Sequence, residues 1–142
     1  MGYIMKNTIL IVEDESVTAL DLKFTLEDLG YEVVGIADTA EDAINLAAEL
    51  SPDLTIMDIH LKGEMTGIEA AKKISELNLP VIFLTAYYDD ETFGNALECS
   101  STYAFITKPF NKNNIRLNVD SAIKRSKVDA EKLDMAHGFI KK

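Results

Sequence analysis

The chain has 142 residues, the size of one domain, and its hydrophobic content of 47% is enough to form a buried core. Its formal net charge of -10 argues against a basic surface that grips nucleic acid or an anionic membrane. One cysteine excludes an internal disulfide, and the two histidines show no zinc-site spacing. No membrane-length apolar run and no secretory signal pattern is present, so we expect a cytoplasmic protein.

Apolar runs and helical patterns alternate five times along the chain. Continuous runs of β-branched and apolar residues are typical of strands that are buried on both faces. The runs cover residues 8–12, 32–37, 54–58, 81–84 and 103–106. Such alternation favours right-handed crossovers, so we predict an α/β fold with a parallel sheet and helices on both faces.

A helical pattern follows each run. The first is expected to end at Gly30, the second to begin at Thr39, the third to follow Gly67, the fourth to span about residues 89–99, and the last to begin at Asn111. The positions expected to face the core are Val17, Leu20, Phe24, Leu26, Ala43, Ile44, Ala47, Leu50, Ile68, Ala71, Ile74, Leu77, Ile115, Val119 and Ala122. The fourth helix is more polar and carries Phe93, Ala96 and Leu97.

The apolar seam of the last helix continues beyond residue 123. Its members are Ser126, Ala130, Leu133, Ala136 and Ile140. The segment is either a frayed, charged tail or a long helix that packs on a second copy or leads to an output module. We assign residues 6–127 to the main domain and residues 128–142 to a C-terminal helical extension or linker of unknown role.

Five chemically active residues stand at the carboxyl ends of the predicted strands. Glu13 and Asp14 follow the first strand, and Asp58 ends the third. Thr85 follows the fourth strand, and Lys108 follows the fifth. In open α/β sheets ligands bind beyond these ends, and a strand order of 2-1-3-4-5 would bring the three carboxylates together. Asp58 alone could merely cap a turn, but the combination predicts a site.

The residue types at this edge suit phosphoryl chemistry. Like charges about 4 Å apart repel by about 4 kcal/mol at an effective dielectric constant of about 20, so the acids need a cation. An all-oxygen pocket suits Mg²⁺. Lys108 and Thr85 can bind phosphoryl oxygens while Asp58 attacks in line. Each residue also has a purely structural explanation. Lys108 could form an ion pair with Asp58, and Thr85 could be an ordinary hydroxyl at a strand end. Glu13 and Asp14 could be an acid pair favoured by the dipole at a helix N-terminus.

Four motifs in this order and spacing resemble the receiver domain of two-component response regulators. They are Ile-Val-Glu-Asp-Glu, Ile-Met-Asp-Ile-His-Leu, Phe-Leu-Thr-Ala and Phe-Ile-Thr-Lys-Pro-Phe, within about residues 8–127. The resemblance implies a flavodoxin-like (βα)5 fold with a parallel five-stranded sheet. It also implies a domain that accepts a phosphoryl group from a sensor histidine kinase or phosphotransfer protein. Such a domain catalyses only its own phosphorylation and dephosphorylation.

The resemblance also implies roles for individual residues. Asp58 becomes the phosphoacceptor, and Mg²⁺ is bound by the acid pair Glu13 and Asp14, by Asp58 and by the backbone carbonyl of His60. Thr85 and Lys108 bind the phosphoryl oxygens, and the Lys108-Pro109 peptide is typically cis.

A conformational switch is implied as well. Thr85 would move toward the phosphoryl group while Phe105 turns inward, and this changes the surface of the fourth helix, fifth strand and fifth helix. That surface, or the C-terminal helix, is a candidate for a homodimer. Phe105 could alternatively be an ordinary core residue.

The chain departs from the common receiver pattern in three places. Glu13 stands where many receivers have Asp, His60 is a less common choice two residues after the phosphoacceptor, and the loop 62–67 is one residue longer. His60 could influence the lifetime of the phosphoryl group or be a surface residue without a catalytic role.

Two other functional classes fit the residues less well. A haloacid-dehalogenase-like phosphohydrolase has an acid at the position where this chain has His60. A flavodoxin-like cofactor carrier requires a Ser/Thr/Gly-rich phosphate loop where this chain has the acidic residues 13–15. The chain is either a single-domain relay or a receiver fragment of a larger regulator. We expect no direct contact with nucleic acid or membrane; the sequence names neither the cognate kinase nor the downstream effector.

Overall fold

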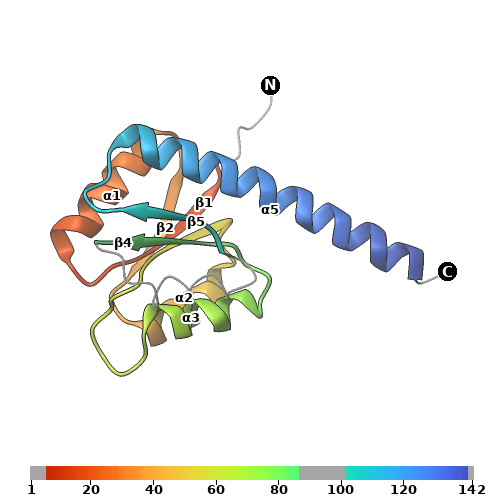
Figure 1. The fold of residues 1–142 in the computed structure, drawn as a ribbon, viewed down its shortest axis with the longest axis horizontal. Coiled ribbons are helices and arrows are strands. Elements are labelled where there is room, and N and C mark those ends of the chain that lie inside the picture. Colours follow the sequence, from red (N-terminus) through yellow and green to blue (C-terminus); the bar gives the residue numbers. More distant parts are fainter. Residues whose placement is uncertain (1–5, 87–101, 141–142) are drawn as a thin grey trace.

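The sheet has the predicted topology. A computed structural model describes residues 6–86 and 102–140, with side chains described up to residue 132. Its five strands are parallel and lie in the order β2-β1-β3-β4-β5 (Figure 1). They are β1 (Thr8–Val12), β2 (Glu32–Ala37), β3 (Leu54–Asp58), β4 (Val81–Thr85) and β5 (Thr102–Thr107). The flavodoxin-like α/β class and the order 2-1-3-4-5 are therefore confirmed.

Helices cover both faces of the sheet (Figure 1). The described helices are α1 (Ser16–Asp28), α2 (Ala40–Leu50), α3 (Gly67–Ser75) and α5 (Lys112–Ile140). One core lies between the sheet and α1 with α5, and a second lies between the sheet and α2 with α3. The helix predicted at about residues 89–99, with Phe93, Ala96 and Leu97, lies outside the described residues.

Polar caps fix several helix ends as the sequence predicts. The Thr39 hydroxyl accepts a hydrogen bond from the backbone N–H of Asp42, and Asn111 Oδ1 accepts one from the N–H of Asn114 at 2.8 Å. Gly30 follows α1 with φ +96°, a left-handed conformation that favours glycine. These polar groups and the glycine therefore mark the ends of α1, α2 and α5 where the sequence predicts them.

The predicted core face of α1 is wrong, apart from Leu26. Val17, Leu20 and Phe24 are 82%, 47% and 63% exposed, whereas Ala19 and Leu22 are buried with Leu26. Both sets have the same spacing of three and then four residues, and they are offset by two positions, so they lie on opposite sides of the helix. Periodicity could not distinguish the two stripes. The small Ala19 side chain suits the face that approaches the sheet closely.

Two further core predictions are wrong because the residues lie at helix ends. Leu50 is the last residue of α2 and is 39% exposed, and Leu77 follows the end of α3 and is 45% exposed. Leu77 lies beyond the end of α3, so it no longer shares the direction of the buried face of that helix. Ala43, Ala47, Ala71, Ile74, Ile115, Val119 and Ala122 are buried as predicted.

Helix α5 is much longer than its contact with the sheet. It runs without a break to Ile140 and projects past the body of the domain (Figure 1). The backbone thus follows the long-helix interpretation, and it shows no boundary at residue 128. The division into residues 6–127 and 128–142 stays a prediction. Within the described residues, no helix is long and apolar enough to cross a membrane.

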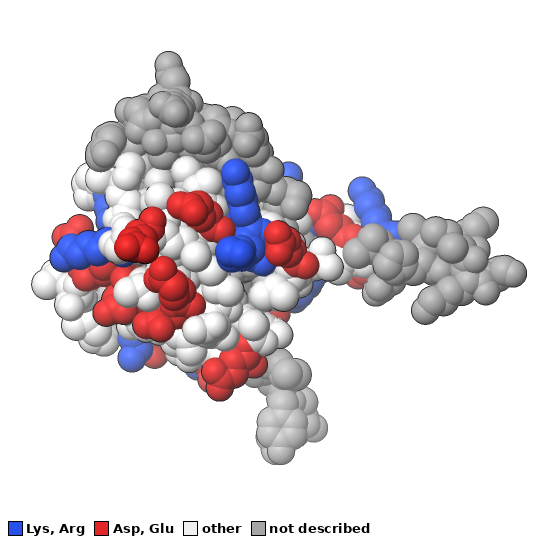
Figure 2. Space-filling view, turned by 90° about the horizontal axis from the view of Figure 1, so that it is seen from below, with Lys and Arg blue, Asp and Glu red and all other residues white. Residues whose placement is uncertain are grey.

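The excess of acids is visible on the face covered by α2 and α3. Figure 2 looks at the molecule from below the view of Figure 1, and acidic side chains gather on this face. Glu41 and Asp42 of α2 and Glu69 of α3 are among the exposed acids. Such a face repels phosphate-rich partners. The absence of direct nucleic-acid binding remains a prediction.

Candidate functional site

The fold brings the predicted residues together at the carboxyl edge of the sheet. Glu13 and Lys108 directly follow β1 and β5, and Asp58 and Thr85 are the last residues of β3 and β4. Counted over the whole residue, Glu13, Asp58 and Thr85 are at most 5% exposed. Because β1 and β3 are neighbours, their acids face each other across the switch point of the sheet order.

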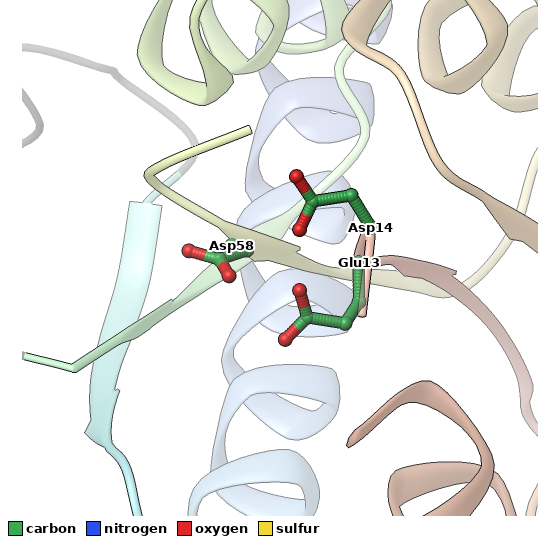
Figure 3. A group of neighbouring side chains, drawn as sticks. All are labelled: Glu13, Asp14 and Asp58. Atoms are coloured by element: carbon green, nitrogen blue, oxygen red, sulfur yellow. The ribbon is translucent and has the colours of Figure 1, made fainter. Parts of the chain in front are cut away.

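Three carboxylates converge on one small space. One carboxylate oxygen from each of Glu13, Asp14 and Asp58 lies within 4.8 Å of the other two. In Figure 3 the Glu13 and Asp14 side chains extend from the end of β1 toward Asp58 on β3. Three hard oxygen donors at this spacing can hold a small divalent cation that keeps some of its waters. The donor set therefore fits Mg²⁺ in kind and in number.

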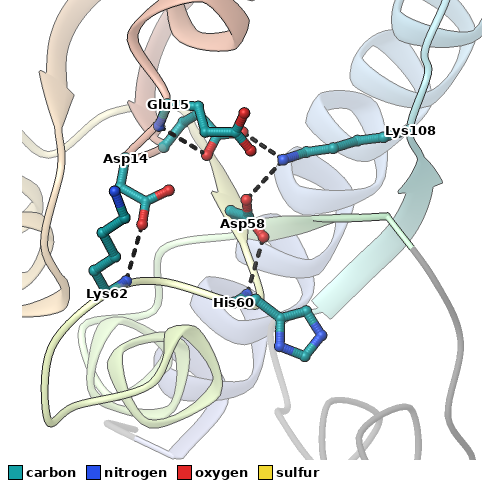
Figure 4. Close-up of polar contacts among 7 residues, drawn as sticks. Asp14, Glu15, Asp58, His60, Lys62 and Lys108 are labelled. Atoms are coloured by element: carbon teal, nitrogen blue, oxygen red, sulfur yellow. Dashed lines mark hydrogen bonds and ion pairs between the residues drawn. The ribbon is translucent and has the colours of Figure 1, made fainter.

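Lys108 bridges two of the acids. Its Nζ lies 2.6 Å from Glu13 Oε1 and 2.7 Å from Asp58 Oδ2, and its side chain is 16% exposed (Figure 4). The ion pair with Asp58 matches the structural explanation, and the one with Glu13 was not predicted. The Lys108-Pro109 peptide is cis, and the Lys108 N–H donates to the Thr85 carbonyl at 2.8 Å. Lys108 thus has fixed neighbours directly after β1 and at the ends of β3 and β4.

The ionisation of this cluster reflects its burial. The pKa of Glu13 is raised to about 7, chiefly by burial; the hydrogen bond from Lys108 acts to lower this pKa, and the nearby Asp58 carboxylate acts to raise it. Burial alone would lower the pKa of Lys108, but its hydrogen bonds to Asp58 and Glu13 outweigh this effect and raise it. The ammonium group therefore stays charged and offsets part of the repulsion between the acids.

Backbone donors of the loop after β3 orient two carboxylates. The N–H of His60 donates to Asp58 Oδ1 at 2.9 Å, and the N–H of Lys62 donates to Asp14 Oδ2 at 3.0 Å (Figure 4). The His60 side chain is exposed, and in Figure 4 its ring points away from the Asp58 carboxylate. Sequence reasoning missed these donors, because a backbone N–H leaves no mark in the residue type.

Gly67 is a further residue that the sequence did not assign to the site. A Cβ atom added to it would lie 2.3 Å from the carbonyl oxygen of Asp58 and 2.9 Å from that of Ile59. The start of α3 therefore packs directly on the backbone that carries Asp58. Only a residue without a side chain fits there.

The two predicted switch residues occupy the neighbouring strands β4 and β5. Thr85 is buried at the end of β4. The Phe105 ring stacks on Phe83, with centroids 5.7 Å apart and an interplanar angle of 24°. Phe105 also packs against the core on the α2 and α3 side. This agrees with a core role, and the switch role of Thr85 and Phe105 stays a prediction.

Comparisons with known proteins identify the family of this chain. A family model described as "Response regulator receiver domain" matches residues 9–120. The regulator PhyR of Methylorubrum extorquens is 35% identical over 84% of this chain and 44% of its own length. The transcriptional regulatory protein PdtaR of Mycobacterium tuberculosis is 33% identical over 82% of this chain and 57% of its own length. The chain thus spans about half the length of these relatives.

Smaller proteins and solved structures are matched over nearly their full length. The chemotaxis protein CheY of Thermotoga maritima is 33% identical over 78% of this chain and 92% of its own. The signal receiver domain of a modulated diguanylate cyclase from Desulfovibrio desulfuricans G20 is 35% identical, with a TM-score of 0.83, over 88% of this chain and 99% of that one. The chain therefore belongs to the response regulator receiver domain family.

Proposed function

We propose that this receiver takes a phosphoryl group onto Asp58 in a Mg²⁺-dependent reaction. The donor is a histidine kinase or a phosphotransfer protein. The observation that carries the proposal is the buried cluster in which Lys108 bridges Glu13 and Asp58 beside Asp14. A nucleophilic carboxylate flanked by a cation site and an ammonium group is the arrangement that phosphoryl transfer to an acid requires.

The two oxygens of Asp58 have different environments. Oδ1 accepts the His60 N–H, and Oδ2 contacts Lys108 Nζ. In the reaction, one oxygen attacks the phosphorus of a phosphohistidine: an O–P bond forms, the N–P bond breaks, and the electron pair returns to the imidazole of the donor. Lys108 and the Thr85 hydroxyl then bind the oxygens of the transferred group.

Glu13, Asp14 and Asp58 would hold the metal ion, together with the His60 carbonyl that the family resemblance implies. Mg²⁺ would neutralise charge on the transferred phosphoryl oxygens. Because the acceptor is part of the chain, no separate substrate is turned over. The chain acts as a phosphoacceptor signalling domain that catalyses only its own phosphorylation and dephosphorylation.

Incubation with acetyl phosphate tests this proposal without the cognate kinase. With Mg²⁺, the intact mass should rise by one phosphoryl group, and the gain should disappear after mild alkali because acyl phosphates hydrolyse there. With EDTA in place of Mg²⁺ no gain is expected. An equal gain in mass with and without Mg²⁺ would contradict the metal-dependent mechanism.

Mg²⁺ should also stabilise the fold in the absence of any phosphodonor. A ligand that binds only the native state at about 100 times its Kd raises the free energy of unfolding by about 2.7 kcal/mol. Thermal unfolding should therefore shift upward with Mg²⁺. Asp14→Asn should lose most of this shift, whereas Asp38→Asn, an exposed acid after neighbouring β2, should keep it. An equal shift in both variants would mean that the cluster does not bind the ion.

The exposed apolar stripe of α1 is suited to docking the phosphodonor protein. Val17, Leu20 and Phe24 face solvent on the helix that begins three residues after Glu13. Phe24→Ser should slow phosphotransfer from the cognate kinase by about tenfold or more, the loss expected for a large apolar anchor at an interface. Phosphorylation by acetyl phosphate should be unchanged, because this small donor needs no docking face.

The control replaces a large exposed apolar side chain on a different helix. Leu117 on α5 is 52% exposed, and Leu117→Ser should leave kinase-dependent phosphotransfer unchanged. The docking role of α1 is refuted if the two serine variants accept phosphate from the kinase equally fast.

The output of the switch is proposed to lie on β5, on α5 and on the helix predicted at about residues 89–99. Either the chain is a single-domain relay, or it is the receiver part of a longer regulator, as the half-length match to PhyR and PdtaR suggests. The unbroken continuation of α5 favours the second form, since such a helix can link two domains. A homodimer through this face or through the C-terminal helix is a further proposal.

A further inference from the structure

Helix α5 leaves the core well before it ends. Its last residues buried against the sheet are Ala122 and Ile123, and residues 127–132 are exposed. We refer to residues 124–140 as the projecting segment. An isolated helix of this length is only marginally stable in water, so any contact with the domain has a large influence on its order and direction.

Tyr103 on β5 contacts two residues at the start of the projecting segment. Its hydroxyl donates a hydrogen bond to the carboxylate of Asp129, and the guanidinium carbon of Arg125 lies 5.3 Å from its ring centroid. Arg125 and Asp129 are four positions apart, so they lie on the same side of the helix. Burial and the neighbouring Asp129 raise the pKa of Tyr103 to about 12, so the hydroxyl remains a donor at neutral pH.

An irregularity in β5 explains why Tyr103 points toward α5. Val81 pairs with Thr102 and Ile82 pairs with Ala104, which leaves Tyr103 as an extra residue between the two pairs. Such a bulge redirects a side chain. In a regular strand, residues two positions apart share a face. Here Tyr103 packs with the α1 and α5 core, whereas Phe105 packs with the α2 and α3 core.

We propose that Tyr103 is a latch that holds the projecting segment of α5 on β5 and transmits a movement of β5 to that helix. The latch is the set Tyr103, Arg125 and Asp129. On the other side of α5, Lys127 Nζ lies 3.5 Å from Asn7 Oδ1, a longer and weaker contact. The transmission part rests on the proposed function, since it needs a phosphoryl group to move β5; the latch itself does not.

Hydrogen exchange of the unphosphorylated protein tests the latch directly. In Tyr103→Phe, which keeps the ring and removes the hydroxyl, amides of residues 125–132 should exchange about two- to tenfold faster, as expected for loss of one hydrogen bond. Tyr31→Phe is the matched control, because Tyr31 is near Asp120 and Arg116 at a different part of α5. Its exchange at 125–132 should equal that of the parent. Unchanged exchange in Tyr103→Phe would overturn the latch.

A double-mutant cycle separates the latch from a general change in helix stability. Asp129→Ala should accelerate exchange as Tyr103→Phe does, and the double variant should show no further increase. Asp120→Ala is the control for this variant. It removes the exposed ion-pair partner of Lys124 and makes the same Asp-to-Ala change in helix propensity as Asp129→Ala, but it leaves the latch residues unchanged. Additive effects of Tyr103→Phe and Asp129→Ala would show that the two side chains do not act together.

Transmission is tested by repeating the exchange measurement after treatment with acetyl phosphate and Mg²⁺. Intact mass gives the degree of phosphorylation of each sample. The parent should show altered exchange at residues 125–132, and equally phosphorylated Tyr103→Phe should not. An equal response in both overturns transmission. If neither protein gains mass, the proposed function and the transmission that depends on it both fail, while the unphosphorylated comparison still decides the latch.

Discussion

Replacing Lys108 by methionine should lower the free energy of unfolding of the metal-free protein by about 3 kcal/mol, because removing one partner of a buried ion pair leaves the other charge uncompensated. Here two acids lose their partner: the Glu13 side chain is 0% exposed and that of Asp58 is 7% exposed. Methionine keeps the length and the apolar stem of the lysine. Urea unfolding in EDTA measures the loss.

Lys112→Met is the matched control for this prediction. Lys112 also forms an ion pair with an acid, Asp28, but both side chains are more than half exposed. Exposed ion pairs contribute about 0–1 kcal/mol, so this variant should unfold almost like the parent. Mg²⁺ should recover much of the stability of Lys108→Met, since the ion can neutralise the same acids. A small, equal loss in both variants would contradict the electrostatic account of the site.

Among substitutions of small residues near the site, Gly67→Ala should cause the largest loss in the free energy of unfolding. The added Cβ would meet the Asp58 carbonyl oxygen at 2.3 Å, and backbone on both sides must move to relieve this contact. We expect a loss of about 3 kcal/mol, the upper part of the range for overpacking. Phosphorylation by acetyl phosphate should also slow, because the displaced backbone carries the acceptor carboxylate.

Gly35→Ala provides the comparison. An added Cβ in β2 would meet only side-chain atoms of Leu10, Leu50 and Leu46, at 3.4 Å or more. These side chains can adjust, so thermal unfolding should change little. If Gly67→Ala unfolds at the same temperature as Gly35→Ala, the close packing of α3 on Asp58 is not what positions the acceptor.

The sheet could be predicted from the sequence because its strands are buried on both faces. Runs such as Ile9–Val12 and Val81–Leu84 are completely apolar and almost fully buried, so their residue types report the environment directly. The α1 helix shows where this reasoning fails. Val17, Leu20 and Phe24 are as apolar as a core stripe, but they lie on the opposite face, because an exposed apolar stripe has the same periodicity as a buried one.

The candidate site was predictable to the extent that it consists of side chains at strand ends. Glu13, Asp58 and Lys108 meet because the strand order places β1 beside β3 and because β5 ends at the same edge. The contacts that orient them come from backbone N–H groups of His60 and Lys62, which any residue type could supply. The strand irregularity at Tyr103 likewise depends on register, which residue types alone do not specify.

Borohydride trapping identifies the residue of this chain that accepts the phosphoryl group. The protein is treated with acetyl phosphate and Mg²⁺ and then with sodium borohydride, which reduces an aspartyl phosphate to homoserine, and the peptides are sequenced by mass spectrometry. We expect homoserine at position 58 in the parent and none anywhere in Asp58→Asn. Homoserine at Asp14 or another acid of the parent, with Asp58 intact, would contradict the assignment of Asp58 as the acceptor.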